Sequence, residues 1–109
     1  MKDLIERAVQ KFNAKALADE KLQKELDGVE RKIVIECRDG PKYNFALRGR
    51  QIGPVNEGPL DGAEVTIISD IATLTALLKK EMGPMKAYAT GKLKIKASLE
   101  DVLRLRKLF

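Results

Sequence analysis

The side chains of this sequence offer little of the chemistry that catalysis usually requires. Among its 109 residues there is no histidine, and Cys37 is the one cysteine. The chain therefore lacks the commonest general base, the usual activator of a serine or cysteine nucleophile, and the ligands of most zinc sites. Carboxylate, lysine and tyrosine groups remain, but the carboxylates mostly occupy the polar faces of expected helices. We expect no enzymatic activity, no metal site and no cofactor.

Burial of apolar groups is the chemistry that the sequence offers instead, and residues 91–109 show it most clearly. From Lys92 to Lys96 charged and apolar side chains alternate, which predicts a strand with one solvated and one buried face. The lysines of this strand are expected on the solvated or edge-protecting face. Ser98, followed three residues later by Asp101, is the signature of a helix start.

The helix that follows Ser98 is apolar over a wide arc. Its apolar residues are Leu99, Val102, Leu103, Leu105, Leu108 and Phe109. At ~100° per residue they span roughly 220°, whereas an ordinary surface helix carries an apolar stripe of roughly 100°. We expect this helix to bury a second side, against more protein, a partner or a small apolar ligand.

Length and composition predict one globular domain with a single core. The chain has 109 residues, of which 44% are apolar and 34% charged, as is typical of water-soluble domains. No apolar run is long enough to cross a membrane, and no signal-peptide pattern opens the sequence. The single cysteine fits a reducing compartment. The cytoplasm is therefore the expected location.

The basic charge is dispersed along the sequence. The net charge is +5, from 21 basic and 16 acidic residues that are interleaved from Lys2 to Lys107. There is no basic arm and no pair of aromatic residues of the kind that stacks on single-stranded nucleic acid. Nucleic acid is therefore not expected as a partner, whereas transient contact with an anionic membrane surface is compatible with this charge.

The elements that position the apolar residues begin with a helix. Five apolar residues share one face of it: Leu4, Ile5, Ala8, Val9 and Phe12. The helical pattern loosens over residues 13–18 and resumes through Leu22 and Leu26. It stops at Gly28, a favourable C-terminal cap.

Alternation with period two then predicts four strands. The first covers residues 30–37, the second 43–47 and the fourth 63–68, while a short third strand runs through Ile52. Residues 56–62 are rich in turn formers and are expected to form a loop.

Two helices are expected before the last strand. Ser69 and Asp70 predict the cap of a helix that ends at Gly83, and Pro84 begins a short helix closed by Gly91. The order of elements is helix, four strands, two helices, strand and helix. It predicts a single α+β domain over residues 1–109, with a largely antiparallel sheet covered on one face by helices.

This succession of elements resembles the sterol carrier protein 2 family of small lipid-binding domains. The resemblance rests on four segments: Gly53-Pro54-Val55-Asn56-Glu57-Gly58, Asp61-Gly62-Ala63-Glu64-Val65-Thr66, Ser69-Asp70 and Gly91-Lys92-Leu93-Lys94-Ile95-Lys96. It extends from about Gly28 to Leu108. Each segment alone is common, but the order and spacing of the four segments are specific to this family.

The resemblance implies a five-stranded, mostly antiparallel sheet with helices packed over it, enclosing an apolar tunnel for a lipid. Ligands of the family include sterols, fatty acids and fatty acyl-coenzyme A. The resemblance therefore implies non-enzymatic binding or carriage of such lipids. The residues expected to line the tunnel are Phe45, Leu47, Leu74, Leu78, Met82, Met85, Leu99, Val102 and Leu103.

Two positions depart from the family pattern. Ala97-Ser98 replaces the usual glycine and polar residue before the last helix, which affects the backbone at the helix entry. The sequence ends in Lys107-Leu108-Phe109 rather than in a Ser-Lys-Leu signal, which argues against import into peroxisomes.

Two alternatives of other classes stay open. In the first, the last helix buries its second apolar side in a symmetric copy or another protein, so that the chain is an interaction module with a filled core. In the second, which is less favoured, the basic surface binds nucleic acid.

Overall fold

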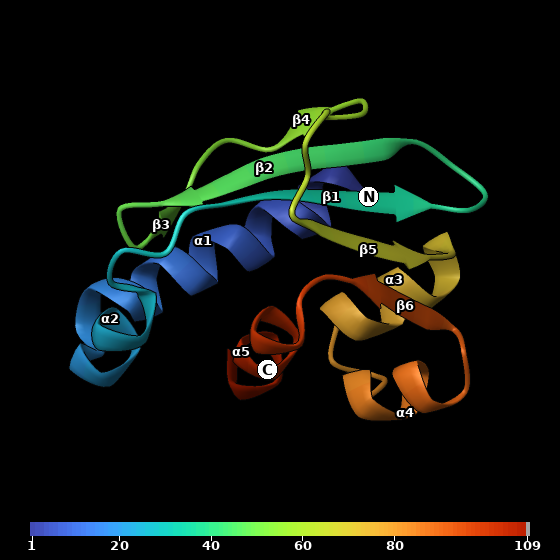
Figure 1. Ribbon diagram of the computed structural model, residues 1–109. Helices are drawn as coiled ribbons and strands as arrows, with labels where there is room; N and C mark the ends of the chain where they lie inside the picture. The colour runs from blue at the N-terminus through green and yellow to red at the C-terminus, as the bar shows by residue number, and fades with distance from the viewer. Residues whose placement is uncertain (109) are drawn as a thin grey trace.

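The structure is a computed structural model that describes residues 1–108, with side chains described through Arg104. Five helices lie beneath one mixed sheet (Figure 1). In chain order the elements are α1 (Lys2–Ala18), α2 (Glu20–Leu26), β1 (Arg31–Cys37), β2 (Lys42–Arg48), β3 (Gln51–Ile52), β4 (Asn56–Glu57), β5 (Val65–Ser69), α3 (Ile71–Leu78), α4 (Pro84–Ala89), β6 (Leu93–Lys96) and α5 (Leu99–Leu108).

The sheet has the order β3-β2-β1-β5-β6, and the short β4 also pairs with β2. β1 and β5 run parallel to each other, whereas every other pair is antiparallel. β3 pairs with Leu47 and Arg48, and β4 pairs with Tyr43 and Asn44, so both lie along the same edge of β2. The sheet is therefore five strands wide, and the predicted α+β class with a mostly antiparallel sheet is confirmed.

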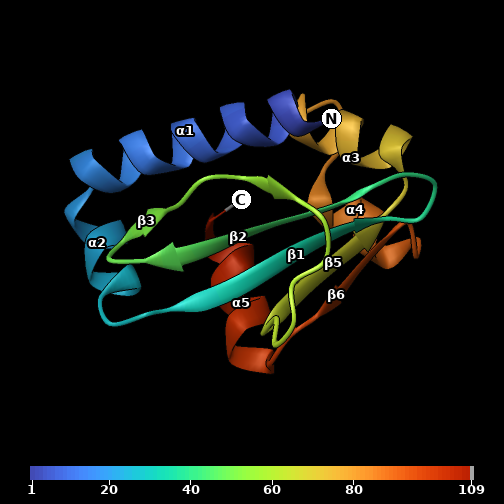
Figure 2. The ribbon, with the colours of Figure 1, turned by 90° about the horizontal axis from the view of Figure 1, so that it is seen from above.

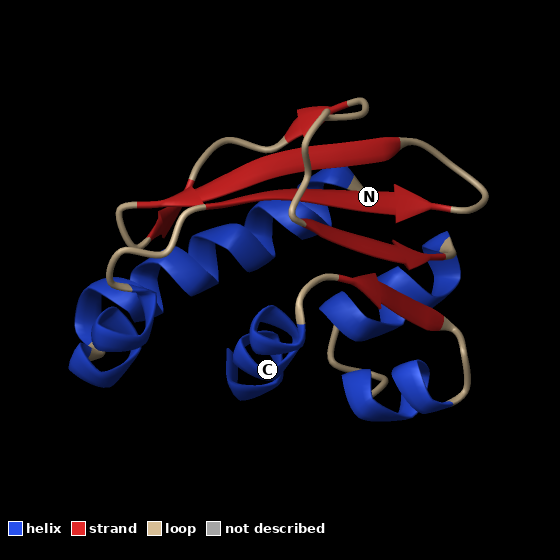
Figure 3. Cartoon of the chain, in the orientation of Figure 1, coloured by secondary structure: helices blue, strands red, loops and turns tan. Residues whose placement is uncertain are grey.

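All helices lie on one side of the sheet (Figure 3). The strands alternate accordingly, with Ile33, Ile35 and Cys37 of β1 buried on the helical side. Val34 is also buried but faces the other side, beside Asn44 of β2. There the Asn44 side chain donates a 3.0 Å hydrogen bond to the Gly58 carbonyl and so holds the β4–β5 connection against the sheet.

Side-chain caps begin three of the helices. Asp19 Oδ1 accepts hydrogen bonds from two backbone N–H groups at the start of α2. Asp70 Oδ1 accepts from Thr73 N–H at 2.7 Å, and Ser98 Oγ accepts from Asp101 N–H at 3.1 Å. Such bonds satisfy N–H groups that have no partner within the helix. The helix starts predicted at Asp70 and Ser98 are confirmed.

Three sequence-based expectations were wrong. The opening helix, expected to run to Gly28, is divided at Asp19 into α1 and α2, and the expected loop over residues 56–62 contains β4. α3 ends at Leu78 instead of reaching Gly83. Lys80 then adopts φ 60°, and the N–H groups of the next residues turn back to the Ala76 carbonyl. Met82, predicted on the face of this helix, lies in the turn that follows it.

Candidate functional site

The helical side of the sheet is apolar across four strands. Cross-strand neighbours on this side form a row of Tyr43, Ile35, Ile67 and Ile95, from β2 across β1 and β5 to β6. Because residues two apart in a strand share a face, this row has the same orientation as the buried Ile33 and Cys37.

The β2–β1 half of this face is tightly covered. Phe45 and Leu47, two predicted tunnel residues, are 8% and 7% exposed. They belong to one core cluster with buried residues of α1 and α2: Ile5, Ala16, Leu22 and Leu26. In the view from above, α1 runs beside β3 and the segment from β3 to β4 (Figure 2). α1 and α2 therefore cover this half together, because both contribute buried residues to the core cluster.

The β5–β6 half is less covered. Ile67 and Ile95 face the helices but are only half-buried, whereas Ile35 in the same row is 7% exposed. α3 and α4, which lie on the helical side near β5 and β6 (Figure 1), are short. Leu74 of α3 is buried, but Leu78 is half-buried. Part of the apolar sheet face therefore remains accessible beside these helices.

The remaining predicted tunnel residues lie at or near the surface. Met82 and Val102 are half-buried, Met85 is 56% exposed, and Leu103 and Leu99 are 48% and 75% exposed. The structure thus brings Phe45, Leu47 and Leu74 into the core and leaves the residues of α4 and α5 at its rim. The tunnel itself stays a prediction. Of the wide apolar arc, the side chains of Leu105 and Leu108, and Phe109 entirely, lie outside the described residues.

α5 is attached to the sheet through charged side chains. Asp101 is 6% exposed, and its two carboxylate oxygens accept bonds of 3.1 and 2.9 Å from Arg31 Nε at the start of β1. Arg104 Nη1 donates to the same carboxylate at 2.6 Å. The hydrogen bond with Asp101 raises the pKa of Arg31 above its ordinary value, so the guanidinium stays charged. A buried carboxylate with two arginine partners is stabilised by its pairing.

This attachment determines which side of α5 is free. Leu99 and Leu103 are two positions from Asp101, and at ~100° per residue they lie roughly opposite it on the helix. Their exposure agrees with that geometry. The sequence predicts Asp101 only as part of the helix start. Arg31 lies 70 residues away in the chain, so the residues around Asp101 do not reveal their contact.

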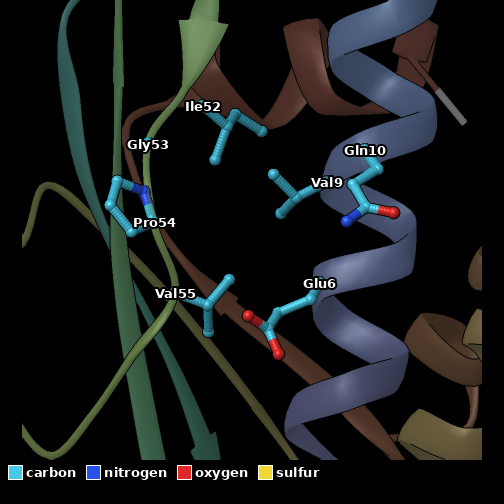
Figure 4. A pocket seen from close by; sticks show the side chains of 7 residues that line it. All are labelled: Glu6, Val9, Gln10, Ile52, Gly53, Pro54 and Val55. Atoms are coloured by element: carbon cyan, nitrogen blue, oxygen red, sulfur yellow. The ribbon is translucent and has the colours of Figure 1, made fainter.

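A groove lies between α1 and the connection from β3 to β4 (Figure 4). Its volume is about 270 Å³, and it is lined by Glu6, Val9, Gln10, Ile52, Gly53, Pro54 and Val55. Val9 and Ile52 also pack against the core cluster, of which Val55 is a buried member. The apolar wall of the groove is therefore continuous with the core.

Asn13 links α1 to Ile52, which is one of the residues that line this groove. Its Nδ2 donates to the Ile52 carbonyl at 2.9 Å, and its Oδ1 accepts from the Ile52 N–H at 2.7 Å. The side chain thereby gives Ile52 both bonds that a neighbouring strand would supply. After Ile52 the chain leaves this clamp: Gly53 N–H donates to the Ala46 carbonyl, and Pro54 has no N–H to donate.

Sequence reasoning missed the groove, although weak signals exist. Asn13 stands where the helical pattern loosens, and a polar residue in line with the apolar face of a helix often has a specific partner. Gly53 and Pro54 favour a short strand through Ile52, and β3 does end at Ile52. Neither signal shows that the break lies opposite Glu6 and Gln10.

Other chemistry is sparse in the described region. Within residues 1–104 no three metal-ligating side chains are grouped closely enough to hold an ion. Burial raises the pKa of the Cys37 thiol, so this side chain packs as a neutral group. None of the helices described is both long enough and apolar enough to span a bilayer.

Comparison with known proteins agrees with this architecture. Residues 9–109 match the sequence profile of the SCP-2 sterol transfer family. The chain belongs to this family. Recognition of the family from the ordered motifs between Gly28 and Leu108 is therefore confirmed. No curated protein sequence matches the chain.

Solved structures of SCP-2 domains share the fold at low sequence identity. Sterol carrier protein domain 2 of Helicoverpa armigera is 18% identical with a TM-score of 0.65, and the alignment covers 96% of this chain and 84% of that domain. Palmitated SCP2L2 from Aedes aegypti is 17% identical with a TM-score of 0.61, over 96% and 89% of the two chains. These likenesses establish the SCP-2 fold.

Part of a larger enzyme has a similar fold. The sec-alkylsulfatase Pisa1 from Pseudomonas sp. is 16% identical with a TM-score of 0.62, over 79% of this chain. This chain spans only 14% of the length of that enzyme.

Proposed function

We propose that this chain binds and carries lipid-like molecules, with the hydrocarbon held between the sheet and the helices. The observation that carries the proposal is the incomplete cover of an apolar sheet face. Ile67 and Ile95 continue the row that contains the buried Ile35, yet they remain half-buried. A bound hydrocarbon would complete their cover.

The expected affinity comes from burial. Removing hydrocarbon from water contributes about 0.8 kcal/mol per methylene. A sixteen-carbon chain would therefore gain on the order of 12 kcal/mol before the several kcal/mol lost when it is immobilised. No reactive group is needed, so carriage is proposed rather than catalysis by this chain.

Membership of the SCP-2 family supports the ligand class. A sterol, a fatty acid or a fatty acyl-coenzyme A is the proposed ligand, and the palmitated Aedes aegypti relative shows that a domain with this fold takes a fatty acyl group. The proposed walls are the predicted tunnel residues: Phe45, Leu47, Leu74, Leu78, Met82, Met85, Leu99, Val102 and Leu103.

Transient contact with an anionic membrane is part of the proposal. α4 buries Ala87 completely and turns Met85 and Tyr88, 56% and 50% exposed, toward solvent, with Lys86 exposed between them. Exposed apolar side chains beside a cation suit the boundary between lipid headgroups and acyl chains. The cytoplasm stays the proposed location.

The experiment that tests lipid carriage is extraction of the purified protein with organic solvent, followed by mass spectrometry. A lipid or fatty acyl species in a stoichiometric amount is expected, and added lipid should raise the unfolding temperature of stripped protein. If no lipid is recovered and none shifts the transition, carriage is wrong.

A second candidate function is self-association through α5. It is favoured by the exposure of Leu99 and Leu103 on the helix side away from Asp101. Analytical ultracentrifugation of stripped protein distinguishes the candidates. A stable dimer that binds no lipid supports the interaction module, whereas a monomer supports the carrier.

A further inference from the structure

The excess positive charge of the chain is concentrated in residues 79–96. Basic side chains occur throughout the sequence, but this segment holds six lysines and a single acidic residue, Glu81. The other 15 basic residues of the chain are balanced by the other 15 acidic residues. The net charge of +5 therefore resides on this segment, and the rest of the chain is formally neutral.

The fold gathers this segment at one end of the molecule. It comprises the turn after α3, the helix α4 and the strand β6, which lie together at the end away from α2 (Figures 1 and 2). The Lys92 N–H donates to the Ala87 carbonyl at 2.9 Å and so ties the approach to β6 to α4. The six lysines are all exposed: Lys79, Lys80, Lys86, Lys92, Lys94 and Lys96.

These lysines have no acidic partner among the side chains that the structure describes, since none of its ion pairs involves them. β6 is an edge strand, and lysines commonly protect such an edge from pairing. This role accounts for Lys94 and Lys96 but not for the lysines of α4 and of the turn before it. A group of exposed, unpaired cations attracts an anionic surface.

Two exposed apolar side chains in the same segment indicate that this surface is a bilayer. Met85 and Tyr88 are three residues apart on α4 and share one face of the helix. Such side chains enter the boundary between headgroups and acyl chains, while lysines beside them face the anionic headgroups. Nucleic acid fits less well, because Tyr88 is the one aromatic residue of the segment and no arginine accompanies it.

The less covered part of the apolar sheet face lies at the same end of the molecule. Ile95 belongs to β6, and its partner Ile67 on β5 is half-buried like it. Leu78 at the end of α3 and Met82 in the following turn are also half-buried. A chain docked by residues 79–96 would therefore hold this apolar face close to the acyl chains of the bilayer.

We infer that residues 79–96 dock the chain on anionic phospholipid bilayers, and that anionic lipid content and ionic strength thereby control exchange of the carried lipid. The control of exchange rests on the proposed function, and the docking surface extends the contact at α4 to the lysines of the turn and of β6. The lysines provide attraction that salt screens, and Met85 and Tyr88 provide apolar contact after encounter.

The first test measures binding of the stripped chain to phosphatidylcholine vesicles with and without phosphatidylglycerol. The wild-type chain should bind the anionic vesicles and leave them as salt is added. The triple variant Lys86→Gln, Lys92→Gln, Lys94→Gln should bind on the order of 100-fold more weakly, because each lysine near an anionic surface contributes about fivefold. Thermal unfolding checks that this variant is folded.

A matched control removes the same charge from the other end of the molecule. Lys11, Lys15 and Lys24 are exposed on α1 and α2. Changing these three to glutamine should weaken binding about twofold or less, because charges farther than a Debye length from the bilayer are largely screened. Equal losses in the two triple variants would overturn the assignment of the docking surface.

A tryptophan reporter tests the orientation, since the chain has no tryptophan of its own. On anionic vesicles the emission of Tyr88→Trp should shift to shorter wavelength and be quenched by lipids brominated in their acyl chains. Leu17→Trp is the control, because Leu17 is 72% exposed on α1; its emission should not change. The reverse pattern would place the docking face on α1 and contradict the inference.

The control of exchange is tested by transfer of a fluorescent fatty acid between vesicles. Wild type should transfer it faster when the acceptor contains phosphatidylglycerol and more slowly at high salt, whereas the triple variant at Lys86, Lys92 and Lys94 should respond to neither. A variant that responds as wild type does would refute this control.

The outcomes separate docking from carriage. Binding that is indifferent to phosphatidylglycerol, or that is weaker than binding to duplex DNA under the same conditions, overturns docking and leaves lipid carriage intact. A chain that docks as expected but yields no extractable lipid and transfers none refutes the proposed function, while the docking surface stands.

Discussion

Ile35 and Ile67 are partners on the parallel strands β1 and β5 and face the same side of the sheet, yet Ile35 is 7% exposed and Ile67 is half-buried. The difference arises from the helices that cover them. α1 and α2 contribute buried residues to the core, and Asn13 fastens α1 to β3. The helices beyond β5 are short, and α5 is attached through the Arg31–Asp101 pair. One half of the sheet face is therefore closely packed, and the other is less completely covered.

The largest expected effect is the matched pair Ile35→Ala and Ile67→Ala. In stripped protein Ile35→Ala should lower the free energy of unfolding by about 3 kcal/mol, because it leaves a cavity in a closed core. Ile67→Ala should cost about 1 kcal/mol, since its side chain is already partly hydrated. Urea unfolding measures both. Equal losses would show that the two halves are packed alike.

Bound lipid should change the difference between Ile35→Ala and Ile67→Ala. In the lipid-loaded chain the cost of Ile67→Ala should rise toward that of Ile35→Ala, because the ligand completes the cover of Ile67. A cost that does not change with loading would place the hydrocarbon elsewhere.

The second effect concerns the attachment of α5. Asp101→Asn should destabilise the chain by about 2 kcal/mol, because Arg31 and Arg104 lose their shared carboxylate in a site shielded from water. Glu100→Gln is the control, since the Glu100 side chain is 78% exposed and exposed pairs contribute about 0–1 kcal/mol. Hydrogen exchange should show faster opening of α5 in Asp101→Asn than in wild type. Unchanged exchange would mean that other contacts hold the helix.

The third expected effect concerns the two hydrogen bonds between the Asn13 side chain and the backbone of Ile52. Asn13→Asp keeps the acceptor for the Ile52 N–H but cannot donate to the Ile52 carbonyl, and it should cost about 1 kcal/mol. Exchange of the Ile52 amide should stay slower in Asn13→Asp than in Asn13→Ala, which removes both bonds. The same exchange rate in the two variants would contradict the two-bond clamp.

The smallest effect is the pH dependence of the α3 cap. The hydrogen bond from Thr73 N–H lowers the pKa of Asp70, so the folded state favours the ionised carboxylate. The stabilisation is present above the ordinary aspartate pKa and is lost as the pH falls through the lowered value, below about pH 4. Asp70→Ala should therefore differ less from wild type at pH 3 than at pH 7 in thermal unfolding. A difference that is the same at both pH values would mean that the carboxylate charge is irrelevant.

Local patterns predicted much of the fold. Alternation placed β1, β2, β5 and β6, and capping residues marked the starts of α3 and α5. These features depend on neighbours within a few residues, so their signals are present in the sequence. The end of α3 was wrong because the bend at Lys80 follows from a non-glycine residue with positive φ, which sequence patterns rarely reveal.

The site was less predictable because it depends on contacts between distant segments. The apolar arc of α5 was correctly noticed, but its orientation is determined by Asp101 and Arg31, which are far apart in the chain. The Asn13 clamp similarly joins α1 to β3. Hydrophobic periodicity tells which side of a helix is apolar; it does not tell what that side faces.

The parallel pairing of β1 with β5 also bears on the order in which the chain folds. β1 and β2 form a hairpin with a short turn, whereas β5 can pair with β1 only after the whole segment between them has been placed. Loop closure over such a distance costs entropy before any contact repays it. A chain emerging from the ribosome therefore carries β1 with one unpaired edge until Ser69 is available. During that interval the β1 edge is open to pairing with other chains, and a chaperone that covers it should raise the yield of folded protein.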